Sequence, residues 1–216
     1  MTRPQKLTLG TLAVLILAAL GWLIYILAAP SDASDDPLAG TPRGYEGQPA
    51  FGDDDAPIKV IFFENFLCDH CKALEAEVMP QLKRDYIDAG QVEAYYVNLA
   101  WGGERAVLAG LAGECAYAQD EAAFWDYKSA LYEAQETWQG VDDLAALAGG
   151  VDALDADALR TCVQEERYSE EVQRDLDLAE RIGVQGTPSL VVGDQGFQGP
   201  SYRTLRREIE AQLRGS

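Results

Sequence analysis

Histidine, cysteine and basic residues are scarce in this chain, and their scarcity excludes several classes of site. The 216 residues include one histidine and four cysteines. A zinc ribbon needs two close pairs of ligands, but only Cys68 and Cys71 are close, whereas Cys115 and Cys162 are far apart in the sequence. A covalent haem site needs a histidine directly after the second cysteine, where this chain has Lys72. We therefore expect no bound metal and no cofactor, and a copper carrier that uses the close pair is the alternative left in this class.

Acidic residues greatly outnumber basic ones. The chain has 17 Lys and Arg against 36 Asp and Glu, which gives a formal net charge of −19. All the acidic residues but only 15 of the basic ones follow residue 30. Such a surface repels the phosphates of nucleic acids and of anionic lipids, so neither is an expected partner. We interpret the acidity as a solvated outer surface.

An uncharged apolar segment begins close to the N-terminus. Residues 7–29 contain no charged side chain, and these 23 residues are enough to cross a bilayer core, which takes about 20. Arg3 and Lys6 precede the segment, and the first charges after it are acidic. The positive-inside rule predicts that residues 1–6 are cytoplasmic and that a single-pass signal anchor places the rest outside the cell membrane. The alternative is a cleaved signal peptide, for which Pro30 gives a poor cleavage context.

The rest of the chain divides into a tether and one domain. Residues 30–50 are rich in Pro, Gly, Ser and Asp, which predicts a flexible acidic tether. Residues 51–216 are long enough for a single domain with its own core, and they contain no internal repeat. We expect a monomer, because the short tether does not provide a dimerisation module.

Cys68-Asp69-His70-Cys71 carries the clearest chemical signal. The apolar run Val60–Phe63 precedes it and a helical pattern follows it, so the cysteines are predicted at the start of a helix that a strand leads into. The free N–H groups and partial positive charge of a helix N-terminus stabilise a thiolate at Cys68. Cys71 lies one turn further along, where it can close a disulfide or resolve a mixed disulfide with a substrate. The motif predicts a redox pair.

The pattern of apolar and turn residues predicts an α/β domain. A strand at 58–63, a helix from 69 to about 86 that Pro80 kinks, and a strand at 92–99 form a βαβ unit. A helical insertion after the second strand, about 103–180, is predicted to contain helices at 104–119, 121–135, 141–148, 155–166 and 168–182. The domain ends with a strand at 189–193, a turn or short strand at 196–199 and a helix at 201–214.

Two motifs at their observed separation resemble the DsbA-like branch of the thioredoxin superfamily. They are Cys68–Cys71 and, about 115 residues later, Gly186-Thr187-Pro188, with similar flanking stretches at 51–58 and 180–189. The resemblance spans about residues 48–213 and implies a thioredoxin-like fold with a helical insertion, preceded here by one N-terminal transmembrane helix. It also implies that a cis peptide bond precedes Pro188 and that the backbone of Thr187 holds an extended substrate peptide beside Cys68. The other interpretation of Gly-Thr-Pro is an ordinary turn.

Two positions depart from the family pattern. Members often carry an acidic residue six positions before the first cysteine, which helps to move protons at the buried sulfur; here that position is Phe62, with Glu64 and Asn65 as polar candidates nearby. The residue after the first cysteine is often proline and is Asp69 here. Its carboxylate disfavours the thiolate, whereas a protonated His70 favours it. We therefore predict an oxidant milder than the strongest members.

Cys115 and Cys162 both fall in predicted helices of the insertion. Four cysteines in an exported chain favour two bridges, and these two remain once Cys68 and Cys71 are paired. Some family members carry a comparable pair. We expect a structural disulfide, with two buried free thiols as the alternative, and a relay of electrons to the active pair is possible but not needed.

Thiol–disulfide exchange is the predicted function. The resemblance implies a membrane-anchored extracytoplasmic thiol–disulfide oxidoreductase, and we expect it to introduce disulfides into exported proteins through Cys68 and Cys71, with a membrane redox partner. A reductase or an isomerase is the alternative on the same scaffold. In a different class, the chain is a non-catalytic or metal-carrying tethered module. We interpret its aromatic cluster, Phe124, Trp125, Tyr127, Tyr132 and Trp138, as core rather than as a peptide-binding surface.

Overall fold

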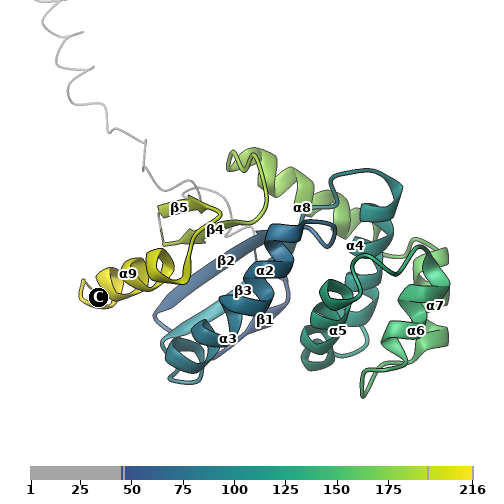
Figure 1. The fold of residues 1–216 in the computed structure, drawn as a ribbon, viewed down its shortest axis with the longest axis horizontal. Helices are drawn as coiled ribbons and strands as arrows, with labels where there is room; N and C mark the ends of the chain where they lie inside the picture. The colour runs from purple at the N-terminus through teal and green to yellow at the C-terminus, as the bar shows by residue number, and fades with distance from the viewer. Residues whose placement is uncertain (1–44, 46, 194, 216) are drawn as a thin grey trace, which may run out of the picture. The chain divides into compact units, whose positions relative to one another are not determined.

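The computed structural model describes residues 45, 47–193 and 195–215, which form one sheet with helices packed against it (Figure 1). Five strands lie in the order β1-β3-β2-β4-β5. They are β1 Ala50–Phe51, β2 Ile58–Glu64, β3 Val92–Asn98, β4 Ser189–Val192 and β5 Gln195–Gln198. The predicted cytoplasmic residues 1–6 and the predicted anchor 7–29 lie outside the described residues. Within the described part of the chain, no helix combines the length and apolar character needed to cross a membrane.

β2 and β3 form the parallel centre of the sheet. Their register runs without a bulge from Ile58 opposite Val92 to Glu64 opposite Asn98. Both strands are rich in β-branched and aromatic residues and are buried on both faces, which is typical of strands that helices cover on two sides. The predicted βαβ unit is confirmed, and the two strands differ from their predicted ranges by one residue at one end.

The helical segment after Cys68 is interrupted. It consists of α2 Asp69–Glu77, α3 Met79–Leu82 and a π-helical turn at Lys83–Ile87. The predicted kink is present, but the break falls at Val78, because Pro80 fits the first turn of a new helix and has no N–H to donate to the turn before it. Together with α9, Tyr202–Leu213, these helices cover the sheet face that carries Phe62 (Figure 1).

The opposite face of the sheet is covered by α8, Ser169–Arg181, and by residues that precede β1. Tyr45 packs in the same apolar cluster as Phe63 and the α8 side chains. The buried carboxylate of Asp175 on α8 accepts one hydrogen bond from the Gln48 side chain and another from the backbone N–H of Asn98, at 2.9 Å. Residues 45 and 48–50, which the sequence assigns to the tether, therefore contribute to the fold.

The insertion after β3 packs around a core that it shares with Phe66, Cys71 and Tyr96. Its helices are α4 Glu104–Tyr117, α5 Glu121–Glu133, α6 Val141–Ala148 and α7 Ala156–Gln164, and α8 leads back to the sheet. Each lies within two residues of its predicted range. Four members of the aromatic cluster are buried in this core and Trp125 is half-buried, so the prediction of a core role is confirmed.

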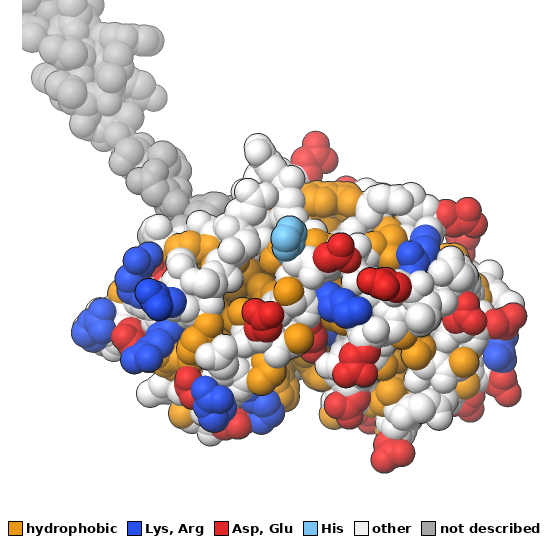
Figure 2. Space-filling view, in the orientation of Figure 1, with side chains coloured by type: hydrophobic (Ala, Val, Ile, Leu, Met, Phe, Trp, Pro, Cys, Tyr) orange, Lys and Arg blue, Asp and Glu red, His pale blue; other side chains and the backbone are white. Residues whose placement is uncertain are grey.

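Charge is unevenly distributed on the surface. Figure 2 shows Lys and Arg side chains gathered over α9 and α3, whereas Asp and Glu predominate over the insertion. Exposed arginines on α9, at 203, 206, 207 and just beyond its end at 214, account for much of the basic region. On the face shown in Figure 2, the acidic side chains therefore lie mainly away from α9.

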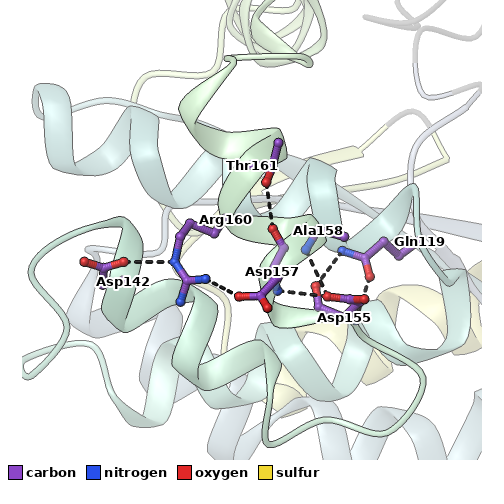
Figure 3. A network of polar contacts seen from close by, with 7 residues as sticks. All are labelled: Gln119, Asp142, Asp155, Asp157, Ala158, Arg160 and Thr161. Atoms are coloured by element: carbon purple, nitrogen blue, oxygen red, sulfur yellow. Dashed lines mark hydrogen bonds and ion pairs between the residues drawn. The ribbon is translucent and has the colours of Figure 1, made fainter.

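A polar network ties the insertion helices together (Figure 3). The Asp155 side chain caps the N-terminus of α7 by accepting hydrogen bonds from two backbone N–H groups of the first turn, both at 2.9 Å. Gln119, just beyond α4, exchanges two hydrogen bonds with the backbone of Asp155. Arg160 pairs with Asp142 on α6 and with Asp157 on its own helix. The ends of three helices are fixed by these few contacts.

Candidate active site

Cys68 lies at the N-terminus of α2. It is the N-cap residue, with an extended backbone (φ −94°, ψ 118°), and its carbonyl accepts the N–H groups of Cys71 and Lys72, each at 3.0 Å. The side chain makes no capping hydrogen bond, and its Sγ instead donates to the carbonyl oxygen of Thr187 at 3.4 Å. The residue is partly exposed. Its sulfur is therefore close to the positive end of the helix and open to an attacking thiolate.

Cys71 is the buried member of the pair, and both cysteines are free thiols. Burial, and after it the charge of Glu64, raises the pKa of the Cys71 thiol above its usual range, while a hydrogen bond to the backbone of Asn65 acts in the opposite direction. A thiol with a raised pKa ionises little at neutral pH. The chemistry of Cys71 therefore needs a nearby group that exchanges its proton.

A loop lies against Cys68, and a groove begins at that loop. The peptide bond between Thr187 and Pro188 is cis, and the Thr187 carbonyl receives the Cys68 hydrogen bond. A groove of about 580 Å³ runs from this loop between α2 and the segment from β5 to α9. The structure thus brings Thr187, Pro188 and both cysteines together beside a space that an extended peptide can enter. Asp69 and His70 are exposed in the first turn of α2, and their effect on the thiolate stays a prediction.

Glu64 is the acidic residue that acts on the buried cysteine. Phe62, at the position where the family often has an acid, packs in the apolar core. Glu64 ends β2 on the same face and is fully buried. Its Oε2 accepts a hydrogen bond from the Tyr132 hydroxyl at 2.7 Å, whereas its Oε1 has no hydrogen-bond partner. Burial raises the pKa of Glu64 to about 7, although the charge of Lys128 lowers it.

Lys128, a residue that the sequence reasoning missed, is buried beside Glu64. Its Nζ lies 3.6 Å from Glu64 Oε1 and hydrogen-bonds Glu75 on α2. Three aromatic rings surround the ammonium, with centres 5.0 to 5.7 Å away: Tyr96, Trp125 and Tyr132. The sequence signal that could have identified Lys128 is its place on the apolar face of a predicted helix, four positions after Phe124 and four before Tyr132.

Asn65 connects the cysteine turn to the loop after β3. Its backbone carbonyl accepts the N–H of Cys68 at 3.0 Å, its side-chain oxygen accepts the N–H of Leu67 at 2.7 Å, and its amide donates to the carbonyl of Trp101 at 2.7 Å. The Trp101 side chain is 38% exposed and, with Val107, is one of two exposed large apolar side chains in the described part of the chain. Asn65 therefore links the cysteine turn to the loop that carries the exposed Trp101.

The other two cysteines are joined to each other within the insertion. Cys115 on α4 and Cys162 on α7 form a disulfide with their Cα atoms 6.0 Å apart. Both residues are buried in the insertion core. A structural role for this bridge, rather than a role in electron transfer, stays a prediction.

Comparisons with known proteins agree with this geometry. The profile of a family described as thioredoxin matches residues 45–211, a range that includes both motifs and the insertion. The disulfide bond formation protein D of Bacillus subtilis is 30% identical over 190 residues, which cover 86% of this chain and 85% of that protein. The crystal structure of oxidised BdbD from Bacillus subtilis matches with a TM-score of 0.75 and 30% identity, over 78% of this chain and 94% of that one. DsbA of Chlamydia trachomatis matches with a TM-score of 0.71 and 26% identity, over 78% and 92%.

Proposed function

Because the chain belongs to the DsbA-like branch of the thioredoxin superfamily and is a thiol–disulfide oxidoreductase, we propose that it introduces disulfides into exported proteins. The observation that carries this proposal is the position of the Cys68 sulfur, partly exposed between the N-terminus of α2 and the Thr187 carbonyl, with Cys71 buried behind it. Relatives named for disulfide bond formation favour the oxidising direction.

The reaction starts from the Cys68–Cys71 disulfide. A substrate thiolate attacks the Cys68 sulfur, forms a mixed disulfide and displaces Cys71 as a thiolate, which takes up a proton. A second substrate thiolate then attacks the substrate sulfur of the mixed disulfide, so the substrate leaves oxidised and Cys68 leaves as a thiolate. Two electrons have passed from the substrate to the cysteine pair. The helix N-terminus stabilises the Cys68 thiolate, and the backbone of Thr187 holds the extended substrate.

Glu64 exchanges the proton of Cys71 in this scheme. The carboxyl is buried, acts on the Cys71 thiol through its charge, and leaves Oε1 without a hydrogen bond. Its pKa of about 7 makes both the acid and the carboxylate available near neutral pH. The residue can therefore protonate the departing Cys71 and deprotonate it in the reverse step.

The proposed location is extracytoplasmic. Residues 7–29 act as a single-pass anchor with residues 1–6 in the cytoplasm, and residues 30–44 act as a tether. The Cys115–Cys162 disulfide supports an oxidising compartment, because cytosolic thiols are kept reduced. A membrane redox partner reoxidises the pair, and the domain acts as a monomer.

The deciding measurement is the reduction potential of the Cys68–Cys71 pair in glutathione buffers, with mass spectrometry to identify which cysteines open. A potential near about −120 mV supports an oxidase, whereas one near about −270 mV shows a reductase. A stable dimer in solution favours an isomerase. If the two cysteines hold a metal and never form a bridge, the redox function is wrong.

A further inference from the structure

One helix of the insertion reaches into the redox site. Lys128, Ser129 and Tyr132 on α5 contact two carboxylates that belong to other layers, Glu64 on β2 and Glu75 on α2. Among the buried residues of the described chain, Lys128 is the one base. A fully buried lysine is rare and needs charged partners. Its presence at this position therefore calls for a reason beyond packing.

The two carboxylates beside Lys128 differ in their access to water. Glu75 accepts hydrogen bonds from Lys128 and from Ser129 Oγ, and its partly exposed side chain lines a cavity of about 480 Å³ between α2, α3 and α5. Glu64 has no exposed surface. Of the four carboxylate oxygens, Glu64 Oε1 is the one without a hydrogen bond. The Lys128 Nζ lies 3.6 Å from it, which is too long for a hydrogen bond but close enough for strong attraction.

We propose that Lys128 is a positioning residue of the redox reaction: its ammonium, 3.6 Å from Glu64 Oε1, holds this buried carboxylate as the acceptor of the Cys71 proton and leaves Oε1 without a hydrogen bond. The inference rests on the proposed function. Burial and the charge of Glu75 both favour a neutral Glu64, and a neutral carboxyl cannot accept the proton. Lys128 opposes both effects through its charge. Through Lys128, the insertion thereby supplies a positive charge on which the reaction of Cys71 depends.

The step concerned is the resolution of a mixed disulfide at Cys68. The Cys71 thiol gives its proton to Glu64 Oε1, and the Cys71 thiolate attacks the Cys68 sulfur. The bond between Cys68 and the partner sulfur breaks, and the partner leaves as a thiolate with the electron pair. The Cys71 sulfur is oxidised, the partner sulfur is reduced, and Glu64 later releases the proton to water.

Five titratable groups act on Glu64 from three elements. They are Cys71 and Glu75 on α2, Tyr96 on β3, and Lys128 and Tyr132 on α5. Burial raises the pKa of both tyrosines well above the usual range. Burial lowers the pKa of Lys128, but the two carboxylates outweigh it and raise the pKa overall. Lys128 therefore stays charged at neutral pH, where Glu64 titrates.

The test is the pH profile of glutathione release from a mixed disulfide at Cys68. The reduced full-length chain in detergent is mixed with glutathione disulfide, quenched with acid and analysed by mass spectrometry between about pH 5 and pH 9. In the unsubstituted protein, the release rate is expected to rise with pH around a midpoint near 7, the pKa of Glu64. In Lys128→Met the midpoint is expected to move up by at least about one unit, which lowers the rate at pH 7 at least about fivefold.

Two further variants separate a charge effect from a structural one. Lys128→Arg keeps the positive charge and is expected to bring the midpoint back towards that of the unsubstituted protein. Tyr132→Phe removes the hydrogen bond to Glu64 Oε2, which lowers the pKa of Glu64, and is expected to raise the midpoint by a smaller amount. If Lys128→Met does not fold, Lys128→Gln takes its place, and an unmoved midpoint in that variant overturns the proposal.

The outcomes distinguish this inference from the function on which it rests. A midpoint in Lys128→Met that stays where it is in the unsubstituted protein overturns the proposal, and so does a loss of rate that is equal at every pH. If the unsubstituted protein forms no mixed disulfide at Cys68, the proposed function itself is wrong. Normal formation of the mixed disulfide with an unmoved midpoint rejects the role of Lys128 alone.

Discussion

The sheet with its covering helices and the helical insertion are held together by different means. The sheet relies on strand pairing and on apolar side chains buried on both faces, and its two cysteines are free thiols. The insertion relies on a disulfide, a capped helix and exposed ion pairs around an aromatic core. The two cysteine pairs differ accordingly: the pair proposed to react includes the partly exposed Cys68, whereas the pair expected to stabilise the fold is bridged and buried in the insertion.

Cys68→Ser is expected to give the largest effect in the sheet half, because no Cys68–Cys71 disulfide can form for the substrate thiolate to attack. Turnover of a cysteine-containing substrate falls to background. Cys71→Ser is expected to accumulate mixed disulfides at Cys68, which non-reducing electrophoresis detects. Cys115→Ser is the matched control and keeps turnover. Full activity of Cys68→Ser contradicts the mechanism.

Replacing both Cys115 and Cys162 with serine is expected to destabilise the insertion without changing the chemistry. The bridge closes a loop with a sequence separation of 47 residues. The chain-entropy model assigns a loop of this size about 4 kcal/mol of stabilisation through the unfolded state. Urea unfolding measures the loss, and the reduction potential of Cys68–Cys71 stays the same. A shifted potential with unchanged stability makes the assignment of a structural role wrong.

Glu64→Gln is expected to weaken the dependence of stability on pH. The pKa of Glu64 is raised to about 7 from 4.5, so the folded state holds a proton that the unfolded chain releases. This stabilisation is complete below about pH 4.5 and is lost as the pH rises to about 7. The free energy of unfolding should therefore fall less steeply across this window in the variant. Glu114, whose pKa burial also raises to about 7, leaves a residual slope. Urea unfolding with the same slope in both proteins contradicts the prediction.

Asp155→Ala is expected to give the smallest effect, confined to the insertion. The change removes the side chain that caps α7 in Figure 3, and loss of such a cap costs about 1 kcal/mol. Asp155→Asn keeps the accepting oxygen and is the matched control. Thermal unfolding compares the two. Equal melting temperatures of the alanine and asparagine variants show that the cap contributes nothing to stability. A change in the reduction potential of Cys68–Cys71 shows that the insertion and the redox site are not independent.

Local patterns predicted most elements, because their signals lie within a few residues. The turn at Cys68 and the helix-rich insertion were found in this way, whereas the role of the Thr187-Pro188 loop was implied by the resemblance to the DsbA-like family. β1 was missed because two residues, Ala50 and Phe51, carry no periodicity and gain their structure from pairing with β3. The break at Val78 was placed two residues late for a similar reason, since a proline marks a helix start as well as a kink.

The candidate site was predicted only where its residues share a motif. Glu64 was one of two polar candidates for moving the proton of the buried cysteine, and the sequence did not choose between them, because the position of each side chain relative to Cys71 depends on how β2 and α2 pack. Lys128 and Glu75 were missed altogether, since each is an ordinary charged residue of a helix until α5 meets α2. The contact between the insertion and the sheet half forms only when the chain folds, and no residue spacing within either segment indicates it.

The hydrogen bond between Cys68 and Thr187 joins residues that are 119 positions apart. Translation delivers the chain from its N-terminus, so the reactive turn is synthesised long before the loop that completes the site. The cysteines also emerge in the order of their pairing, Cys68 with Cys71 and then Cys115 with Cys162. A nascent chain that joins each new cysteine to the one before it reaches the right pattern without reshuffling. Both cysteine pairs are therefore synthesised before the Thr187-Pro188 loop that completes the site.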